Sequence, residues 1–300
     1  MVFDKNDPRA QLSSAASGTG ASEFGTSEYA NFYESPPQLE DAFGKTWMTR
    51  GQNFLVAFSL LEAGARLRRT RIEQEHIILL HDAEMSCVVS AEGEVLEDSG
   101  RSLIVLPPGD SEIEMTSRGR VVEIISTTNE SLNSLCVNAE SYFTPKPNVA
   151  PVTLWPTPAD GFHLRRYSLD VDPEPGRFGR IWRTTNLMVN YSEPRHGPRD
   201  VTKMSPHTHD DFEQGSLCLS GGFVHHLRWP WTTDSRHWRE DEHQICAGPS
   251  LAVIPPLVVH TSQQISEGVN QLVDIFSPPR QDFSKMDGWV LNSDDYPAFA

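Results

Sequence analysis

Short apolar runs alternate with turn-forming residues along most of the chain. The runs are rich in Val, Ile, Leu and Phe and are bounded by Gly, Pro, Asn or Asp, a pattern typical of β-strands separated by turns. Clear examples are NFLVAFSLL (53–61), EHIILL (75–80), SLIVL (102–106), NLMVNY (186–191) and SLAVI (250–254). Few stretches keep a helical period. The pattern predicts an all-β protein, built as a barrel or a sandwich.

The two halves of the chain repeat this pattern in the same order. SLIVLPP at 102–108 matches SLAVIPP at 250–256, a shift of 148 residues, and IEQEHIIL at 72–79 aligns with FEQGSLCL at 212–219, a shift of 140. The shift grows because the second half carries an insert, WPWTTDSRHWREDEH, at 229–243. We therefore predict two related β-domains.

Composition between the repeated runs predicts the domain boundaries. Residues 1–40 are rich in Ser, Gly and Ala, which bury too little apolar surface to become ordered, so we expect a mobile tail. A Pro-rich linker at 143–175 separates a first domain at 41–142 from a second at 176–284. Residues 285–300 are expected to form a C-terminal tail.

Charge and composition exclude several classes of partner. The 300 residues carry 25 basic and 41 acidic side chains, a formal net charge of -16. Nucleic acids and anionic membranes would repel such a chain, so we expect neither as a partner. No apolar run approaches the roughly 20 residues of a membrane-spanning helix, and the N-terminus lacks the pattern of a secretory signal. The four scattered cysteines form no C-x-x-C pair, which fits a cytoplasmic location.

The stretch SPHTHDDFEQGSLCLSGG (205–222) carries the main candidate chemistry. His207 and His209 are two residues apart, so on a strand both imidazoles point to the same side. Glu213 could join them after a turn, and His260 could come from a distant strand of the same sheet. Three imidazoles and a carboxylate suit one divalent metal ion per chain, and the set fits Fe, Mn, Ni, Co and Zn alike.

The spacing of these residues resembles the two motifs of the cupin superfamily. The matching positions are His207, His209, Glu213 and Gly221 or Gly222 in the first motif, and Gly248, Pro255 and His260 in the second. The resemblance implies two cupin-type barrels in one chain, each a double-stranded β-helix or jelly roll, with a mononuclear metal site in the second. The chain departs from the family pattern where Pro-Leu replaces the usual Pro-x-Gly.

A second resemblance adds an alternative fourth ligand. DIFSPPRQDF (274–283) is similar to the C-terminal end of small metal-binding cupins of sugar-acid catabolism, some of which use Gln in place of Glu. Gln214 therefore rivals Glu213. Successive strand residues point to opposite faces, so only one of the two should reach the ion. We favour Glu213, because its carboxylate offsets the charge of the metal.

The internal repeat supplies a comparison for this site. A shift of 140 places Leu67 and Arg69 at the positions of His207 and His209, and a shift of 148 places Glu112 at the position of His260. We therefore expect the first domain to be a degenerate, metal-free barrel.

Three further residues, which follow the first motif in the sequence, are candidates for catalysis. His225 and His226 lie on the next apolar run, where strand alternation points one of them inward as a general base or a partner of the metal ligands. Arg228 could bind a substrate carboxylate with two parallel hydrogen bonds.

The sequence as a whole predicts a metal-dependent bicupin enzyme. Its substrate would be a small oxygenated organic molecule chelated by the metal, and the reaction either a dioxygenation or an isomerase or lyase reaction. The alternative is a non-catalytic cupin protein that binds a metal or a small ligand. Exposed strand edges favour association, so a homodimer is expected.

Overall fold

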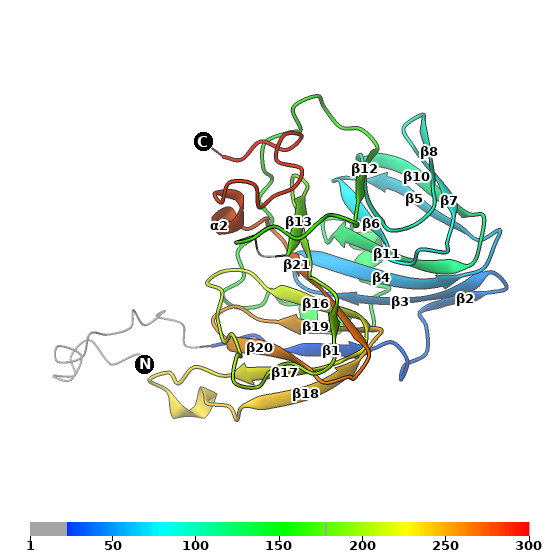
Figure 1. Ribbon diagram of the computed structural model, residues 1–300. Coiled ribbons are helices and arrows are strands. Elements are labelled where there is room, and N and C mark those ends of the chain that lie inside the picture. The colour runs from blue at the N-terminus through cyan, green and yellow to red at the C-terminus, as the bar shows by residue number, and fades with distance from the viewer. Residues whose placement is uncertain (1–22, 178, 300) are drawn as a thin grey trace. The chain divides into compact units, whose positions relative to one another are not determined.

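The computed structural model describes residues 23–177 and 179–299, and most of the ordered elements are β-strands (Figure 1). The described chain divides into two compact units. The C-terminal unit contains residues 23–31, 144–150 and 194–272. The N-terminal unit contains residues 32–143, 151–193 and 273–299. None of the helices in the described part of the chain is long and apolar enough to cross a membrane.

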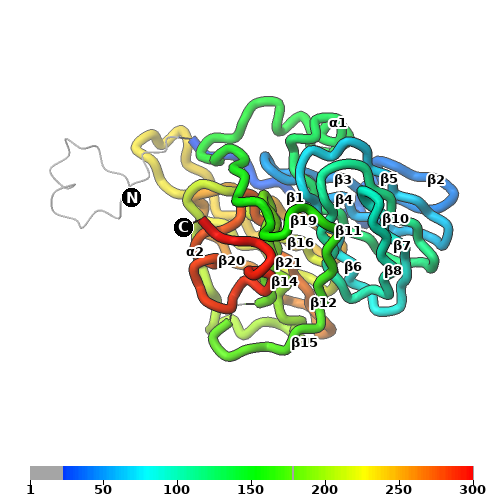
Figure 2. The backbone as a smooth tube through the Cα atoms, turned by 90° about the horizontal axis from the view of Figure 1, so that it is seen from above, coloured from blue at the N-terminus to red at the C-terminus, as the bar shows by residue number. Residues whose placement is uncertain are grey.

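The N-terminal unit is built on a seven-stranded and a four-stranded antiparallel sheet. The first sheet has the order β12-β9-β6-β11-β4-β3-β2, and the second has the order β5-β10-β7-β8. Figure 2 labels the four strands of the second sheet, β5, β10, β7 and β8, in one region of the tube. The strands are β2 (Leu39–Asp41), β3 (Gly44–Arg50), β4 (Phe54–Leu61), β5 (Arg66–Ile72), β6 (His76–Leu80), β7 (Cys87–Ala91), β8 (Glu94–Asp98), β9 (Ser102–Leu106), β10 (Gly109–Met115), β11 (Gly119–Ser126) and β12 (Arg165–Ser168).

Short elements complete this unit. They are α1 (Glu130–Asn133), η2 (Ala139–Tyr142), β13 (Arg180–Arg183), β14 (Met188–Tyr191) and α2 (Gln281–Ser284). Strand β21 (Val269–Phe276) runs through both units, and its last residues, from Val273, pair with β14.

Aliphatic side chains from both sheets fill the interior of the N-terminal barrel. Ile78 and Leu106 from the larger sheet belong to the same buried cluster as Val89 and Ile113 from the smaller one. Burying each such side chain stabilises a fold by about 1.5–3 kcal/mol, before the entropy of ordering is counted. This interior is a packed core.

The C-terminal unit repeats the same plan with fewer strands. Strand β19 lies between β1 and β16, and β17 lies between β18 and β20. The strands and the one short helix are β1 (Glu28–Asn31), β15 (Arg195–His196), β16 (Gln214–Ser220), β17 (Gly222–Arg228), η3 (Ser235–His237), β18 (Glu242–Ala247), β19 (Ser250–Ile254) and β20 (Val259–Gln264). The prediction of an all-β chain with two related domains is confirmed.

The strand pairings correct the register of the repeat. Leu106 lies opposite His76 in the N-terminal unit, and Ile254 lies opposite Gln214 in the C-terminal unit. Since Leu106 and Ile254 end the matching runs SLIVL and SLAVI, His76 corresponds to Gln214 and the shift here is 138 residues, not 140. The shift of 140 matches the Glu-Gln pairs of the two halves. These pairs are not equivalent, because Gln74 lies before β6 whereas Gln214 is the first residue of β16.

Three segments predicted as tails or linker contain ordered structure. Glu28–Asn31 form β1 and pair with β19, because their backbone groups complete the ladder of that strand. Residues 165–168, within the predicted linker, form β12 and pair with β9. The remaining tail prediction, for residues 1–22, lies outside the described residues.

The predicted C-terminal tail is also ordered, because its polar and aromatic groups find buried partners in the N-terminal unit. Tyr296 is 1% exposed, and its hydroxyl donates a hydrogen bond of 2.6 Å to Glu75 Oε1. The other carboxylate oxygen accepts from the backbone N–H and the hydroxyl of Thr185, at 3.0 and 2.9 Å. Burial raises the pKa of Glu75 above its usual value.

Tyr296→Phe should lower the free energy of unfolding by about 1–3 kcal/mol, because it removes the hydroxyl and leaves a buried carboxylate oxygen without its donor. Urea denaturation followed by tryptophan fluorescence measures the change. Tyr33→Phe, at a residue that is 50% exposed, is the matched control, with an expected effect within about 0.5 kcal/mol. Equal effects of the two variants would show that the C-terminal segment does not stabilise the fold.

Candidate metal centre

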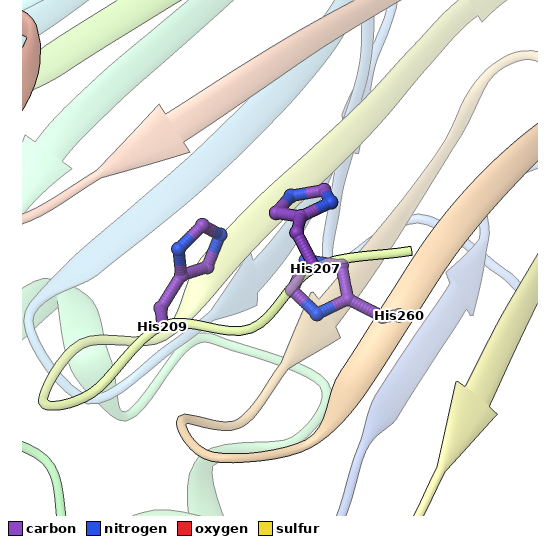
Figure 3. A group of neighbouring side chains, drawn as sticks. All are labelled: His207, His209 and His260. Atoms are coloured by element: carbon purple, nitrogen blue, oxygen red, sulfur yellow. The ribbon is translucent and has the colours of Figure 1, made fainter. Parts of the chain in front are cut away.

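Three histidine side chains converge in the C-terminal unit. Each of His207, His209 and His260 offers a ring nitrogen, and these nitrogens all lie within 4.8 Å of one another. Figure 3 shows His207 and His209 on one loop and His260 on the neighbouring strand. The ring centroids of His207 and His260 are 4.4 Å apart. The structure thus brings together the three histidines that the sequence selected.

Backbone hydrogen bonds hold the loop against β20. His207 N–H donates to the carbonyl of His260 at 3.0 Å, and His260 N–H donates to the carbonyl of His207 at 2.8 Å. At the other end of the H-x-H sequence, Leu257 N–H donates to the carbonyl of His209 at 2.6 Å. These bonds fix both ends of the H-x-H sequence relative to His260.

Two carbonyl groups determine which nitrogen of two of the rings carries the proton. Nδ1 of His207 lies 2.9 Å from the Ser205 carbonyl, and Nδ1 of His260 lies 2.9 Å from the Val258 carbonyl. A carbonyl oxygen only accepts, so each Nδ1 is the donor and each Nε2 presents a lone pair. Metal-binding histidines are commonly oriented by such a second hydrogen bond.

Gln214 adds an oxygen to the group. Its Nε2 donates to Ser216 Oγ at 3.0 Å, which orients Oε1 toward the histidines. Oε1 lies 2.8 Å from His209 Nε2 and 3.4 Å from His260 Nε2. His260 Nε2 presents a lone pair, so its contact with Gln214 Oε1 brings two acceptor atoms together, as the ligands of a divalent cation are.

The structure does not bring Glu213 into this group. Glu213 is buried, but among the described residues no carboxylate belongs to the set of converging ligand atoms. Gln214 begins β16, and the residue before it points to the opposite face of the strand. The geometry therefore favours Gln214 as the fourth ligand and reverses the preference for Glu213.

His225 points into the interior of the C-terminal barrel. It is fully buried, and its Nδ1 lies 2.9 Å from Oγ of Ser262, which is two residues beyond His260 on the same face of β20. Its Nε2 has no hydrogen-bond partner among the described residues. Burial lowers the pKa of His225 to about 4, so the ring is uncharged at neutral pH.

His226 and Arg228 lie on the other face of β17 from His225, and neither belongs to the group of converging ring nitrogens. Nδ1 of His226 lies 2.7 Å from Nδ1 of His243, and Arg228 forms an ion pair of 2.7 Å with Asp241. Both side chains thus contact other residues, and their expected role in catalysis stays a prediction. Strand alternation points one of two successive histidines inward, and only the pairing of β17 with β20 shows that it is His225.

The N-terminal barrel holds different residues at the equivalent positions. Arg69 lies opposite Ser111 in the same way that His207 lies opposite His260. Arg69 therefore takes the position of His207, and Ser111 takes that of His260. The expected replacements Leu67, at the position of His207, and Glu112, at that of His260, came from the wrong register. Arg69 forms a buried ion pair of 2.5 Å with Glu123, and its cationic guanidinium would repel a metal ion.

The sequence missed His76, which occupies the position of Gln214. The ring is fully buried, and neither of its nitrogens has a partner among the described residues. Burial lowers its pKa to about 3, and the nearby Arg69 adds to this effect. Only the corrected register identifies this histidine.

Polar side chains line the C-terminal barrel where the N-terminal core is aliphatic. By strand pairing, Ile78, Val89 and Ile113 correspond to polar residues of the C-terminal unit. These are Ser216, His225 and Ser262. The C-terminal interior therefore presents polar groups next to the histidines.

Comparisons with known proteins identify the fold. No family model and no curated protein sequence matches the chain. A Lactobacillus farciminis oxalate decarboxylase formate complex is 14% identical with a TM-score of 0.55, covering 86% of this chain and 88% of its own. AerE from Microcystis aeruginosa is 8% identical with a TM-score of 0.54, covering 86% and 99%. A mutant of the Bacillus subtilis oxalate decarboxylase is 12% identical with a TM-score of 0.55, covering 90% and 83%.

Gln214→Ala should weaken the binding of a divalent metal roughly 10–100-fold, because it removes the amide oxygen that faces the histidines. Metal content after dialysis, determined by mass spectrometry, measures the loss. Glu213→Gln is the matched control and should retain about as much metal as the wild type. Loss of metal in Glu213→Gln but not in Gln214→Ala would restore the carboxylate as the ligand.

His76→Gln, which copies the residue of the second barrel, should reduce the acid sensitivity of the fold. An unfolded histidine has a pKa of about 6.5, so below that pH the unfolded chain binds a proton that folded His76 excludes, and stability falls with pH. Between pH 6.5 and pH 5 the wild type should lose about 2 kcal/mol more than the variant. Urea denaturation at both pH values tests this, and identical losses would contradict a buried, uncharged His76.

Proposed function

We propose that this chain, a bicupin in fold, is a metal-dependent enzyme that acts on a small carboxylic acid within its C-terminal barrel. The observation that carries the proposal is the convergence of His207, His209 and His260 with Gln214 Oε1, where lone pairs meet. Three imidazoles and an amide oxygen are suitable ligands for Fe, Mn, Ni, Co or Zn. When bound, such an ion supplies a Lewis acid that polarises a substrate oxygen.

The surroundings of this group support catalysis rather than a structural role. A structural metal site is closed by its ligands, whereas a catalytic site keeps a position open. Here Ser216, His225 and Ser262 stand in place of core aliphatic residues, so the interior is polar beside the histidines. A substrate could reach this interior through the side of the group at which His207 is exposed.

His225 is the residue best placed to move a proton. Ser262 holds its Nδ1, which leaves Nε2 for a substrate in the barrel interior. The uncharged ring can accept a proton from the substrate, and an anionic substrate would raise its pKa toward neutrality. Proton transfer beside a polarised carbonyl or carboxylate is the requirement of an isomerase or lyase, so we favour these over a dioxygenase.

We infer the substrate class from the positive charge of a bound metal ion and from the proteins of similar structure. Two of the three compared structures are oxalate decarboxylases, and one of them is a complex with formate. A carboxylate would bind the metal through its oxygens, beside the uncharged His225. We therefore propose a small mono- or dicarboxylic acid with an additional keto or hydroxyl group.

A turnover screen tests the function. Protein loaded separately with each metal is incubated with a panel of small keto, hydroxy and dicarboxylic acids, while NMR follows the products and an electrode follows dissolved oxygen. We expect conversion of at least one acid without oxygen uptake. Oxygen uptake coupled to turnover would identify a dioxygenase instead, and metal-dependent binding of an acid without conversion would identify a non-catalytic binding protein.

His225→Gln should lower kcat by about 10²–10⁴-fold, because it removes the group that accepts the proton, while the metal content stays unchanged. Single-turnover rates with the acid found in the screen measure the effect. His196→Gln, on the exposed strand β15, is the matched control and should retain the wild-type rate. Unchanged turnover in His225→Gln would remove this residue from the proposal.

A further inference from the structure

A second pair of histidines meets on the outer face of the three-stranded sheet β18-β17-β20. His226 on β17 and His243 on β18 are direct cross-strand partners. Their Nδ1 atoms are 2.7 Å apart, and their ring centroids are 4.9 Å apart. Both side chains are accessible to solvent, and both belong to the C-terminal unit.

Gln263 determines the proton positions in this pair. Oε1 of Gln263 lies 3.0 Å from Nε2 of His226, so Nε2 donates and Nδ1 of His226 presents a lone pair to His243. The contact between the two Nδ1 atoms therefore holds a single proton, supplied by His243. A cation that replaces this proton would meet a lone pair on each ring.

The surroundings of the pair form a small cavity. Its volume is about 160 Å³, and its lining includes both histidines, Asp241, Arg228 and Thr261. The Asp241 carboxylate is held beside the pair by two hydrogen bonds from Arg228, at 2.7 and 2.9 Å. The cavity thus offers room for water molecules next to the two rings, beside an ion pair that has no net charge.

We propose that His226 and His243 form a second binding site for a divalent transition metal ion such as Zn²⁺ or Cu²⁺. Imidazole nitrogens bind these ions at about 2.0–2.1 Å, so two nitrogens on one ion lie somewhat more than 3 Å apart. The rings must separate by a few tenths of an ångström, which the exposed His243 side chain permits. Waters complete the coordination.

This site is distinct from the candidate metal centre. His260 also lines the outer cavity, but its ring nitrogen converges with those of His207 and His209, whereas Thr261, the next residue on β20, lies opposite His226. With two protein ligands in place of four, the outer site should bind its ion more weakly and exchange it faster. The inference uses neither the substrate nor the reaction proposed above.

Zinc titration of the full chain by calorimetry, after removal of all metal, tests the proposal. The wild type should bind two ions per chain with different affinities. The His243→Gln variant should bind the weaker ion at least tenfold less tightly, or not at all, and should keep the tighter one. The His207→Ala/His209→Ala double variant should lose only the tighter ion. Electron paramagnetic resonance of a Cu²⁺ complex of the double variant should show coupling to two imidazole nitrogens.

Three outcomes would overturn the proposal. One is an unchanged second binding event in His243→Gln and in His226→Gln. Another is a single ion in the wild type that the double variant loses completely. The third comes from His237→Gln, a control for exposed histidines in the neighbouring insert. If this variant loses the weaker ion equally, the binding is unspecific.

Discussion

The paired backbone hydrogen bonds between His207 and His260 are the constraint on which the candidate metal centre depends. The loop before β16 has no strand ladder of its own, and this bridge attaches it to β20. The bridge sets His207 beside His260, and the bond from Leu257 to the His209 carbonyl then sets the second imidazole. Gln214 follows where β16 begins. Four side chains from two stretches of sequence therefore meet at one point, three of them from residues 207–214.

Equivalent strands pair in the two barrels, but the side chains that face the interior are aliphatic in one barrel and partly polar in the other. In the N-terminal barrel, aliphatic residues fill the space between the sheets, and the guanidinium of Arg69 pairs with the Glu123 carboxylate near the position of the missing ligands. In the C-terminal barrel, Ser216, His225 and Ser262 take the place of aliphatic residues. Polar residues in an interior cost free energy unless they find partners. Here Ser216 accepts from Gln214, and Ser262 lies within hydrogen-bond distance of His225, so partners within the barrel offset this cost.

The two successive histidines of β17 lie in different surroundings. His225 faces the interior, is uncharged and keeps one nitrogen available. His226 faces the outside and meets His243. Because the strand places them on opposite faces, the proposed proton-transfer group and the proposed surface ligand lie next to each other in sequence without sharing a face. The same alternation separates Glu213 from Gln214.

The sequence by itself determined the all-β class, the internal repeat and the three histidines of the candidate centre. Each of these rests on composition and spacing, which are properties of the chain read in order. Only the tertiary structure decided the register of the repeat, the choice of Gln214 over Glu213 and the inward orientation of His225. It also showed that Glu28–Asn31 pair with β19 and that the segment containing Tyr296 is ordered. Periodicity predicts that side chains alternate between faces, but which face looks inward is fixed by hydrogen bonding to strands distant in sequence.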